Sequence, residues 1–133
     1  MCIFCGIIKG TIPSYKVYED DDFIAFLDIN QATIGHTLVV PKQHYDNIFS
    51  LDDEIAERLG KIVVFLANHL KTTLDIENIN ILNNTGYLAG QTVNHLHIHL
   101  IPRYKEDDVL ISFKHHSLTP KDYNELISKL TLL

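Results

Sequence analysis

The sequence has few basic residues and lacks long apolar runs. Its 133 residues include 11 Lys and Arg against 17 Asp and Glu, which gives a net charge of −6 at pH 7. This balance does not favour nucleic acid or anionic membranes as partners, because both bind to clustered basic side chains. The longest apolar run, IVVFLA at 62–67, is far shorter than the roughly 20 residues of a membrane-spanning helix. We therefore expect neither a nucleic-acid partner nor a membrane span.

Cysteine is also scarce, since Cys2 and Cys5 are the only two in the chain. Two thiols this close together cannot build a disulfide framework. The first segment, MCIFCGIIKGTIP, has too short an apolar part and no basic start for a secretory signal. We therefore expect a cytoplasmic protein with reduced thiols. The chain has no internal repeat or linker, and its length suits one domain spanning 1–133.

Short apolar and alternating segments predict several strands. Residues 15–29 contain two of them, joined at the acidic cluster Glu19–Asp22. A third strand covers 36–41 and ends at Pro41, which cannot donate to a central ladder. Residues 78–84 alternate Ile with Asn and predict a fourth strand, and 85–94 predict a glycine-containing loop.

Two helices are predicted between and after these strands. Ser50, with Asp53 three residues later, indicates a helix start. The following helix carries one apolar stripe, made of Ile55, Leu59, Ile62, Leu66 and Leu70. Val64 and Phe65 lie off this stripe, so the helix is either buried on two sides or also meets a partner subunit. Thr119 and Pro120 begin a short C-terminal helix. The expected class is α+β with a mainly antiparallel sheet.

The segment HLHIHL at 95–100 places a histidine at every second position. On a strand, His95, His97 and His99 share one face and the apolar residues share the other. Three buried imidazoles would each need a partner, which disfavours a purely structural role. The outer two lie roughly 13 Å apart along a strand, so the row does not suit a single metal ion. We expect a division of labour, because imidazole also acts as nucleophile, acid or base near pH 7.

The pattern HLHIHLI resembles the signature of the histidine triad family. Three segments match family segments in the family's order: IFCGIIKGTIPSYKVYEDDDFIAFLDI, GHTLVVPKQH and AGQTVNHLHIHLIPR. They cover residues 2–103, whereas 104–133 is an extension without a family signal. The resemblance implies the histidine triad fold. It also implies a homodimer, in which the long helix and its neighbouring strand pair across a two-fold axis.

The resemblance also implies hydrolysis of nucleotides through a covalent nucleotidyl-histidine. His97 matches the nucleophile, and the backbone carbonyl of His95 would hold its other ring nitrogen. His99 would donate to phosphate oxygens, and His36 would support the row. Asp28 matches the acid that binds ribose hydroxyls. The base would be walled by Ile3, Phe4, Ile7, Ile12, Phe26 and Ile29, and the phosphate would be faced by Asn84, Gly90, Gln91 and Thr92.

Two positions distinguish branches of the family. The uridylyltransferase branch has Gln in place of the third histidine, so His99 favours hydrolysis over transfer. The dinucleoside polyphosphate hydrolases carry Gln at the position of Asn84, so Asn84 favours the phosphoramidase (Hint-like) branch and purine nucleoside phosphoramidates. AGQTVNHLHIHLIPR is also close to the polyphosphate hydrolases, which remain an alternative. Two further alternatives are a nucleotide-binding adaptor with weak catalysis and a hydrolase with zinc at the triad.

A metal site is predicted beside the triad. Cys2 and Cys5 form a CxxC pair, and His44 and His95 sit where some family members complete a Cys₂His₂ zinc site. Such a site would give His95 a structural role and leave the chemistry, which needs no cofactor, to His97 and His99. The alternative is a frayed N-terminus with incidental thiols. The remaining histidines, His69, His115 and His116, have no family counterpart.

Overall fold

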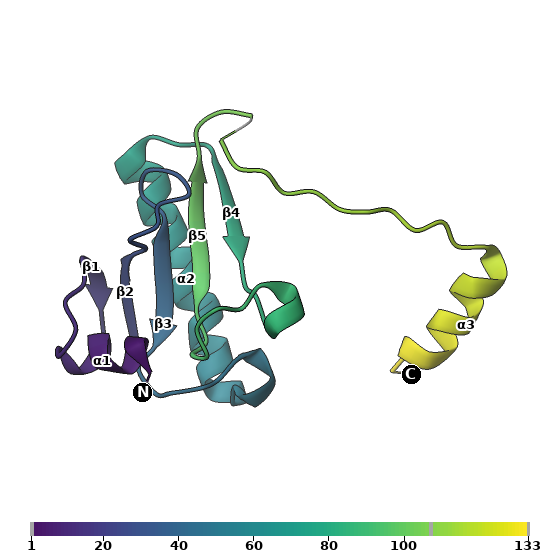
Figure 1. Cartoon of the computed structure of the whole chain (residues 1–133), viewed down its shortest axis with the longest axis horizontal. Coiled ribbons are helices and arrows are strands. Elements are labelled where there is room, and N and C mark those ends of the chain that lie inside the picture. Colours follow the sequence, from purple (N-terminus) through teal and green to yellow (C-terminus); the bar gives the residue numbers. More distant parts are fainter. Residues whose placement is uncertain (1, 107, 133) are drawn as a thin grey trace.

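A computed structural model describes residues 2–106 and 108–132, and it confirms the α+β class. Five antiparallel strands form one sheet in the order β1-β2-β3-β5-β4 (Figure 1). The strands are β1 (Lys16–Glu19), β2 (Phe23–Leu27), β3 (Thr37–Pro41), β4 (Asn78–Leu82) and β5 (Ile98–Arg103). The helices are α1 (Ile3–Lys9), α2 (Asp53–Leu74) and α3 (Pro120–Leu130), with short 3₁₀ turns η1 (Ile48–Ser50) and η2 (Tyr87–Ala89).

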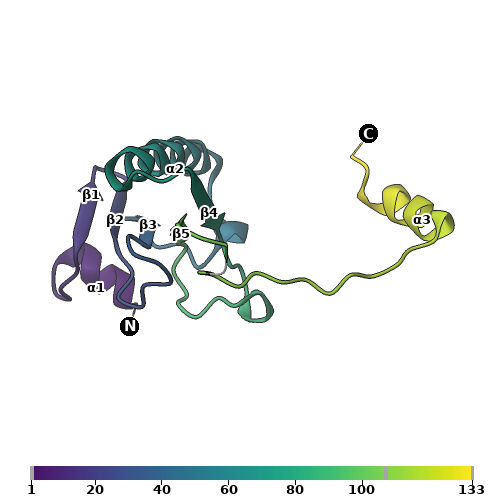
Figure 2. The ribbon, with the colours of Figure 1, turned by 90° about the horizontal axis from the view of Figure 1, so that it is seen from above.

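The two faces of the sheet are covered by different helices. The apolar stripe of α2, which includes Leu59, Ile62 and Leu66, packs on one face with Val39 and Leu100. On the other face, Phe4 of α1 joins a smaller core cluster made of Ile24, Phe26, Leu38 and Val40. Figure 2 shows α1 and α2 on opposite sides of the strands. This arrangement follows from the strand period of two, which sends alternate side chains to opposite faces.

Two predicted boundaries were wrong. The long helix begins at Asp53 because Asp52, not Ser50, is its N-cap, and the Asp52 carboxylate accepts a hydrogen bond from the Ile55 N–H. Ser50 instead ends η1. Strand β5 begins only at Ile98, so two of the three row histidines precede it. They lie where Leu96 N–H bonds the carbonyl of Tyr45 instead of a sheet partner.

The first helix, α1, was missed from the sequence. Cys2 is its N-cap, and its sulfur accepts a hydrogen bond from Cys5 N–H. Gly10 ends the helix in the left-handed conformation, with a φ of 83°, which suits glycine. The sequence signal was weak because cysteine is not among the usual capping residues.

The C-terminal helix begins as predicted, with Thr119 as N-cap and Pro120 in the first turn. Thr119 and Asp122 form a reciprocal capping box. An extended segment, 109–119, separates α3 from the sheet, and the helix lies well away from the rest of the chain (Figure 1). Among the residues that the structure describes, no helix is long and apolar enough to cross a bilayer.

Candidate functional site

The histidines of the row lie on the α1 face of the sheet and are largely buried. His95 is 0% exposed, His97 6% and His36, at the start of β3, 4%. The rings of His97 and His99 meet edge to face with centroids 5.0 Å apart, and His36 lies 5.1 Å from His99. Phe4 of α1 packs edge-on against His97. The alternation predicted from the sequence therefore holds, although the regular strand starts late.

The tautomer of His97 follows from its acceptor. Its Nδ1 lies 2.7 Å from the backbone carbonyl oxygen of His95, and a carbonyl can only accept. Nδ1 therefore carries the proton, and Nε2 presents a lone pair. Asn83 donates from its side-chain amide to the carbonyl of His97, which fixes the backbone of the same residue. The arrangement gives one oriented, unprotonated imidazole nitrogen.

The tautomers of His36 and His99 follow in the same way. The backbone N–H of Ala32 donates to Nδ1 of His36 over 3.1 Å, so the proton of neutral His36 is on Nε2. That nitrogen lies 2.9 Å from Nδ1 of His99, to which it donates. The proton of His99 is therefore on its own Nε2. The chain of donors ends in an N–H that can bind an anionic oxygen.

One side chain, that of Gln31, fixes the loop that carries the Ala32 N–H. This N–H is the first donor in the relay, by which we mean the chain of hydrogen bonds from Ala32 through His36 to His99. The amide nitrogen of Gln31 donates to the carbonyls of Asp28 and His36, and its oxygen accepts from the N–H groups of Gly35 and His36. These four bonds fix the loop between β2 and β3, including the Ala32 N–H. Gln31 and Asn83 were not predicted from the sequence, because a single polar residue in a loop or at a strand end gives no pattern.

Asp28 lies at the edge of the row. One carboxylate oxygen accepts the N–H of Asn30, and the other is 3.7 Å from Nε2 of His36. The side chain is 18% exposed, so a bound molecule can reach it. Its predicted ribose contact stays a prediction.

The structure brings together only part of the predicted base pocket. Phe4 and Phe26 meet edge to face at 5.4 Å within the smaller core, and Ile7 packs on the same cluster. Ile12 covers Gly6 of α1 so closely that a methyl group there would collide with it. Ile3 and Ile29 are instead 50% and 82% exposed. The aromatic residues therefore have a core role, while Ile3 and Ile29 remain available to a ligand.

The loop before the row divides in a similar way. Gln91 is buried, and its amide bonds Gly86 N–H and the carbonyls of Asp46 and Val93, so it braces the loop. Its side-chain amide is already engaged in these bonds, and its predicted contact with phosphate stays a prediction. Gly90 has a φ of 92° and lies beside Asn84. A Cβ added at Gly90 would sit 3.5 Å from the amide nitrogen of Asn84. Exposed Thr92 lines an open depression of about 410 Å³ together with Ile3 and Cys2.

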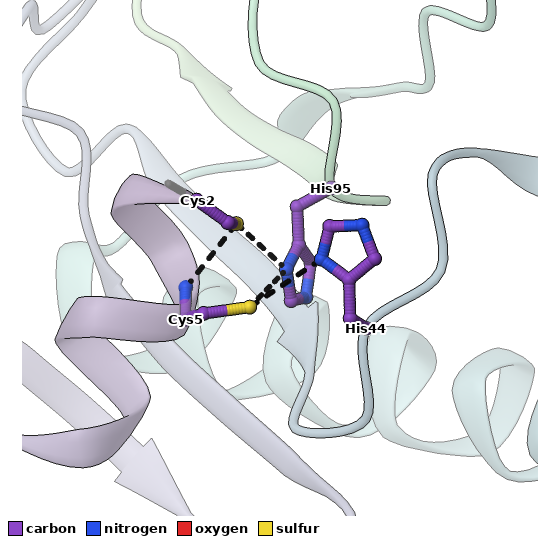
Figure 3. A group of neighbouring side chains, drawn as sticks. All are labelled: Cys2, Cys5, His44 and His95. Atoms are coloured by element: carbon purple, nitrogen blue, oxygen red, sulfur yellow. Dashed lines mark hydrogen bonds between the residues drawn. The ribbon is translucent and has the colours of Figure 1, made fainter.

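A second cluster joins α1 to the row. Cys2, Cys5, His44 and His95 offer ligand atoms that all lie within 4.8 Å of one another, as Figure 3 shows. Their sulfur-to-Nδ1 distances are 3.3 Å from Cys2 to His95, 3.4 Å from Cys5 to His44 and 3.6 Å from Cys5 to His95. The structure thus groups the four residues that were predicted as metal ligands.

The donor set fits a zinc ion. His95 Nε2 donates to the carbonyl of Pro41, and His44 Nε2 to the Asp46 carboxylate, so both Nδ1 lone pairs face the thiols. Bond lengths of 2.3 Å to sulfur and 2.0 Å to nitrogen give a tetrahedral edge of roughly 3.5 Å, which matches the three sulfur-to-nitrogen distances. Two thiols and two oriented imidazoles form a closed set of structural type.

Burial favours the neutral forms of His36, His95 and His99. It lowers the pKa values of His36 and His95 below the usual value of 6.5. It also lowers the pKa of His99 to about 4, with help from neighbouring His97 and His36 and against the opposing effect of the Asp28 carboxylate. A neutral His99 retains the tautomer derived above.

The depressed pKa of His99 predicts acid sensitivity. The unfolded chain takes up the proton near pH 6.5, whereas the folded chain resists until about pH 4, so stability falls as the pH falls through this window. His99 should contribute on the order of 3 kcal/mol to that loss. Urea unfolding at several pH values gives the free energy of unfolding as a function of pH. This free energy should change less steeply with pH for His99→Asn than for the unchanged chain. His69→Asn, at an exposed position of α2, is the matched control, and equal slopes for all three proteins would refute the assignment.

The chain is similar to known proteins of one family. The model of the HIT domain family matches residues 9–106. The chain is 50% identical to Protein hit of Bacillus subtilis (strain 168) over 107 residues, which are 80% of this chain and 74% of that protein. It is 41% identical over 110 residues to the adenosine 5'-monophosphoramidase HNT1 of Saccharomyces cerevisiae, covering 83% of this chain and 67% of the yeast protein.

A solved structure extends the match to the fold. A HIT family protein from Bacillus anthracis superposes with a TM-score of 0.90 at 47% identity, covering 97% of this chain and 94% of the other. At this TM-score and coverage, the two proteins share one fold. The row of histidines, the sheet that carries it and these similarities together show that the chain belongs to the HIT (histidine triad) family.

Proposed function

We propose that this protein hydrolyses purine nucleoside phosphoramidates at the α-phosphorus, with His97 as the nucleophile. The observation that carries this proposal is the hydrogen bond from His97 Nδ1–H to the carbonyl of His95. This bond leaves Nε2 unprotonated and holds the ring in one orientation, which is the condition for nucleophilic attack by imidazole. Only 6% of His97 is exposed, so little water competes for that nitrogen.

In the first step, His97 Nε2 attacks phosphorus and a nitrogen–phosphorus bond forms. The bond from phosphorus to the leaving amine breaks, its electron pair goes to the amine, and the amine takes a proton from solvent. The proton on Nδ1 stays on the ring, and the carbonyl of His95 stabilises the positive charge that develops there. The N–H on His99 Nε2 binds a phosphate oxygen as negative charge builds up.

In the second step, water attacks the same phosphorus. The bond from phosphorus to Nε2 breaks, and its electron pair returns to His97. The proton lost by the water passes to solvent, and the nucleoside monophosphate leaves. The neutral state of His99 and the His36 donor to its Nδ1 are the same before and after, so the relay orients a donor without being consumed.

The substrate class rests on two supports. A relative that is 41% identical over 110 residues is named an adenosine 5'-monophosphoramidase. Asn84, beside Gly90, matches the phosphoramidase branch at the position where polyphosphate hydrolases carry Gln. Dinucleoside polyphosphates are the second candidate, because the segment AGQTVN before the triad resembles those hydrolases as well.

A side-by-side assay tests this choice. The protein is incubated with an adenosine phosphoramidate and with diadenosine tri- and tetraphosphate, and release of AMP is followed for each. We expect the phosphoramidate to be hydrolysed with the highest kcat/KM. Preference for either dinucleotide would refute the substrate assignment, and binding of AMP without any turnover would favour the adaptor alternative.

Two further proposals concern a structural zinc and a homodimer. We propose a structural zinc held by the Cys₂His₂ set described above, in a reducing cytosol where neither cysteine forms a disulfide. We also propose a homodimer formed through α2 and β4, as the family resemblance implies. In its support, a groove of about 460 Å³ between α2, η1 and β4 is lined mainly by apolar side chains, among them Ile48, Val63 and Ile81.

Gln31 offers a test of the relay. Gln31→Ala removes four hydrogen bonds from the loop that carries Ala32 and His36, so His99 loses its fixed tautomer. We expect kcat to fall roughly 10-fold to 100-fold with KM nearly unchanged, because binding of the substrate does not need this orientation. Gln43→Ala, at an exposed glutamine, is the matched control. A kcat equal to that of Gln43→Ala would rule out the positioning role of Gln31.

A further inference from the structure

The relay depends on the loop 28–36, which connects β2 to β3 and includes both Ala32 and His36. This loop lies at the same end of the sheet as the C-terminal end of β5, the strand that carries the third histidine of the row (Figure 1). The described pairing of β3 with β5 ends at Thr37 and Leu100. Beyond that pair, the loop meets β5 through two side-chain hydrogen bonds, which we call the tethers.

The first tether is the hydroxyl of Thr33. It donates to the carbonyl oxygen of Pro102 over 2.5 Å, and Thr33 is only 8% exposed. The carbonyl of Thr33 accepts the N–H of His36 over 3.1 Å, and Thr33 directly follows Ala32 in the chain. A buried bond of this kind is costly to remove, because the acceptor left behind has lost its donor and is shielded from water. Thr33 therefore fixes two members of the relay relative to β5.

The second tether is the hydroxyl of Tyr104, the residue that directly follows β5. It donates to the carbonyl of Ile34 in the loop. The next loop residue, Gly35, has a φ of 98°, and a Cβ there would lie 2.6 Å from a methyl carbon of Leu74 at the end of α2. The loop therefore lies so close to the rest of the domain at this point that only glycine fits.

The position of Tyr104 is itself fixed by a charged pair. The Asp108 carboxylate accepts the Tyr104 N–H over 2.7 Å and Nε of Arg103 over 2.5 Å. The same two donors lower the pKa of Asp108 to about 2, so its carboxylate stays charged near neutral pH. Arg103 also donates to the side-chain oxygen of Asn80 in β4 over 2.6 Å. Tyr104 is thus anchored to two strands of the sheet.

We propose that Thr33 and Tyr104 are positioning residues for the relay. The hydrogen bonds of Gln31 set the shape of the loop, whereas the tethers set its place beside β5, where His99 lies. The effect on turnover rests on the proposed function, but the effect on the ring protons needs no substrate. Tyr104 is the first residue of the C-terminal extension, so that extension contributes to the site although its sequence carries no family signal.

Loss of the tethers acts through the protons of the row. When the loop moves, the Ala32 N–H leaves Nδ1 of His36, and His36 is then free to carry its proton on either ring nitrogen. With the proton on Nδ1, His36 presents a lone pair to Nδ1 of His99 instead of a donor. His99 then loses the bond that keeps its own proton on Nε2, where the proposed phosphate contact needs it.

The first readout locates these protons. The full chain is labelled with ¹⁵N, and two-bond ¹H–¹⁵N spectra near neutral pH report which ring nitrogen of each histidine is protonated. In the unchanged chain, His36 and His99 should both carry the proton on Nε2. The double variant Thr33→Val with Tyr104→Phe removes only the two hydroxyls, and the ring nitrogens of His36 should move to shifts averaged between protonated and unprotonated. Unchanged shifts would overturn the proposal, even if the Tm falls, because a purely structural role lowers Tm alone.

Matched variants separate the tethers from general damage. Thr33→Ser keeps the hydroxyl and should retain the ring-nitrogen shifts of the unchanged chain. Tyr123→Phe removes a hydroxyl from an exposed position of α3 and is the control for Tyr104→Phe. If the double variant does not fold, Tyr104→Phe decides alone, since Tyr104 is 47% exposed and its ring is kept. The His36 shifts should then move in the same direction, and shifts equal to those of Tyr123→Phe would overturn the proposal.

Turnover of the adenosine phosphoramidate is the second readout. The kcat of the double variant should fall roughly 10-fold, whereas Thr33→Ser and Tyr123→Phe should keep the kcat of the unchanged chain. An unchanged kcat in a double variant whose ring protons have moved would overturn the positioning role. If the unchanged chain does not hydrolyse the phosphoramidate, the proposed function fails, and the ring-nitrogen shifts still decide whether the tethers order the relay.

Discussion

His97→Ala is expected to lower turnover of the adenosine phosphoramidate by roughly 10⁴-fold or more. The reason is that Nε2 of His97 is unprotonated, is oriented by the bond from Nδ1 to the His95 carbonyl, and accepts none of the hydrogen bonds described for the row. Neither His36 nor His99 can replace it, because each carries its proton on Nε2 and has its Nδ1 occupied as an acceptor. Initial rates measured with the unchanged chain and the variant give the ratio directly.

Binding should survive the same substitution. AMP affinity, measured by calorimetry, should change by less than about 10-fold, since the predicted ribose and base contacts lie elsewhere, at Asp28 and the α1 face. His69→Ala removes an imidazole from an exposed position of α2 and should leave turnover unchanged. Retention of more than about 1% of the rate by His97→Ala, with folding intact, would exclude His97 as the nucleophile.

Replacing both cysteines is expected to have the largest effect on stability. Cys2→Ala with Cys5→Ala removes two of the four ligands, and a bound structural zinc contributes its binding free energy to folding. We expect the bound zinc to be lost and the Tm to fall by about 10 °C, from roughly 3 kcal/mol of lost stability. Elemental analysis and thermal unfolding measure the two quantities on the same sample.

The expected effect on activity is smaller than the effect on stability. The ligand set pins α1 beside the row through His95, but His95 keeps its bond to the Pro41 carbonyl without the thiols. Turnover below the melting transition should therefore fall less than about 10-fold. His44→Ala should reproduce the loss of zinc, whereas His69→Ala should not. Equal zinc content and equal Tm in the unchanged chain and the double variant would show that these cysteines do not bind a structural zinc.

Part of this site was predictable because side chains alternate along a strand, so the sequence shows which residues share a face. The alternation in HLHIHL placed three histidines on one face, and the structure confirms that face even though β5 starts only at Ile98. The family resemblance, not periodicity, added two distant histidines to the CxxC pair, and the structure gathers all four ligand atoms. Thr119 and Pro120 were enough to locate the start of α3, because capping residues act locally.

Other features depend on contacts that the sequence does not encode locally. Gln31 and Asn83 act on backbone groups that fold beside them, so no spacing rule points to either residue. Asp52 caps α2 instead of Ser50, because Asp52 also accepts the hydroxyl of buried Tyr45, a contact across a loop. Gln91 braces its loop because its amide meets three backbone groups, and no pattern in the sequence indicates this role. Its predicted contact with phosphate stays a prediction.

The proposed reaction depends on which ring nitrogens of the site histidines carry protons. Two backbone groups, the His95 carbonyl and the Ala32 N–H, determine which nitrogen of His97, His36 and His99 carries a proton. A lone pair on His97 and an N–H on His99 then face the same side of the sheet. That pairing of nucleophile and anion donor is the physical basis of the proposed reaction.

The most direct measurement is a search for the covalent intermediate. The protein is mixed with an excess of adenosine phosphoramidate, quenched in alkali within milliseconds to seconds, and analysed by intact-mass and peptide mass spectrometry. We expect an added adenylyl group on the peptide that contains His97, stable in alkali, labile in acid and missing in His97→Ala. Rapid turnover without any adenylyl adduct, or an adduct on a peptide that lacks His97, would contradict it.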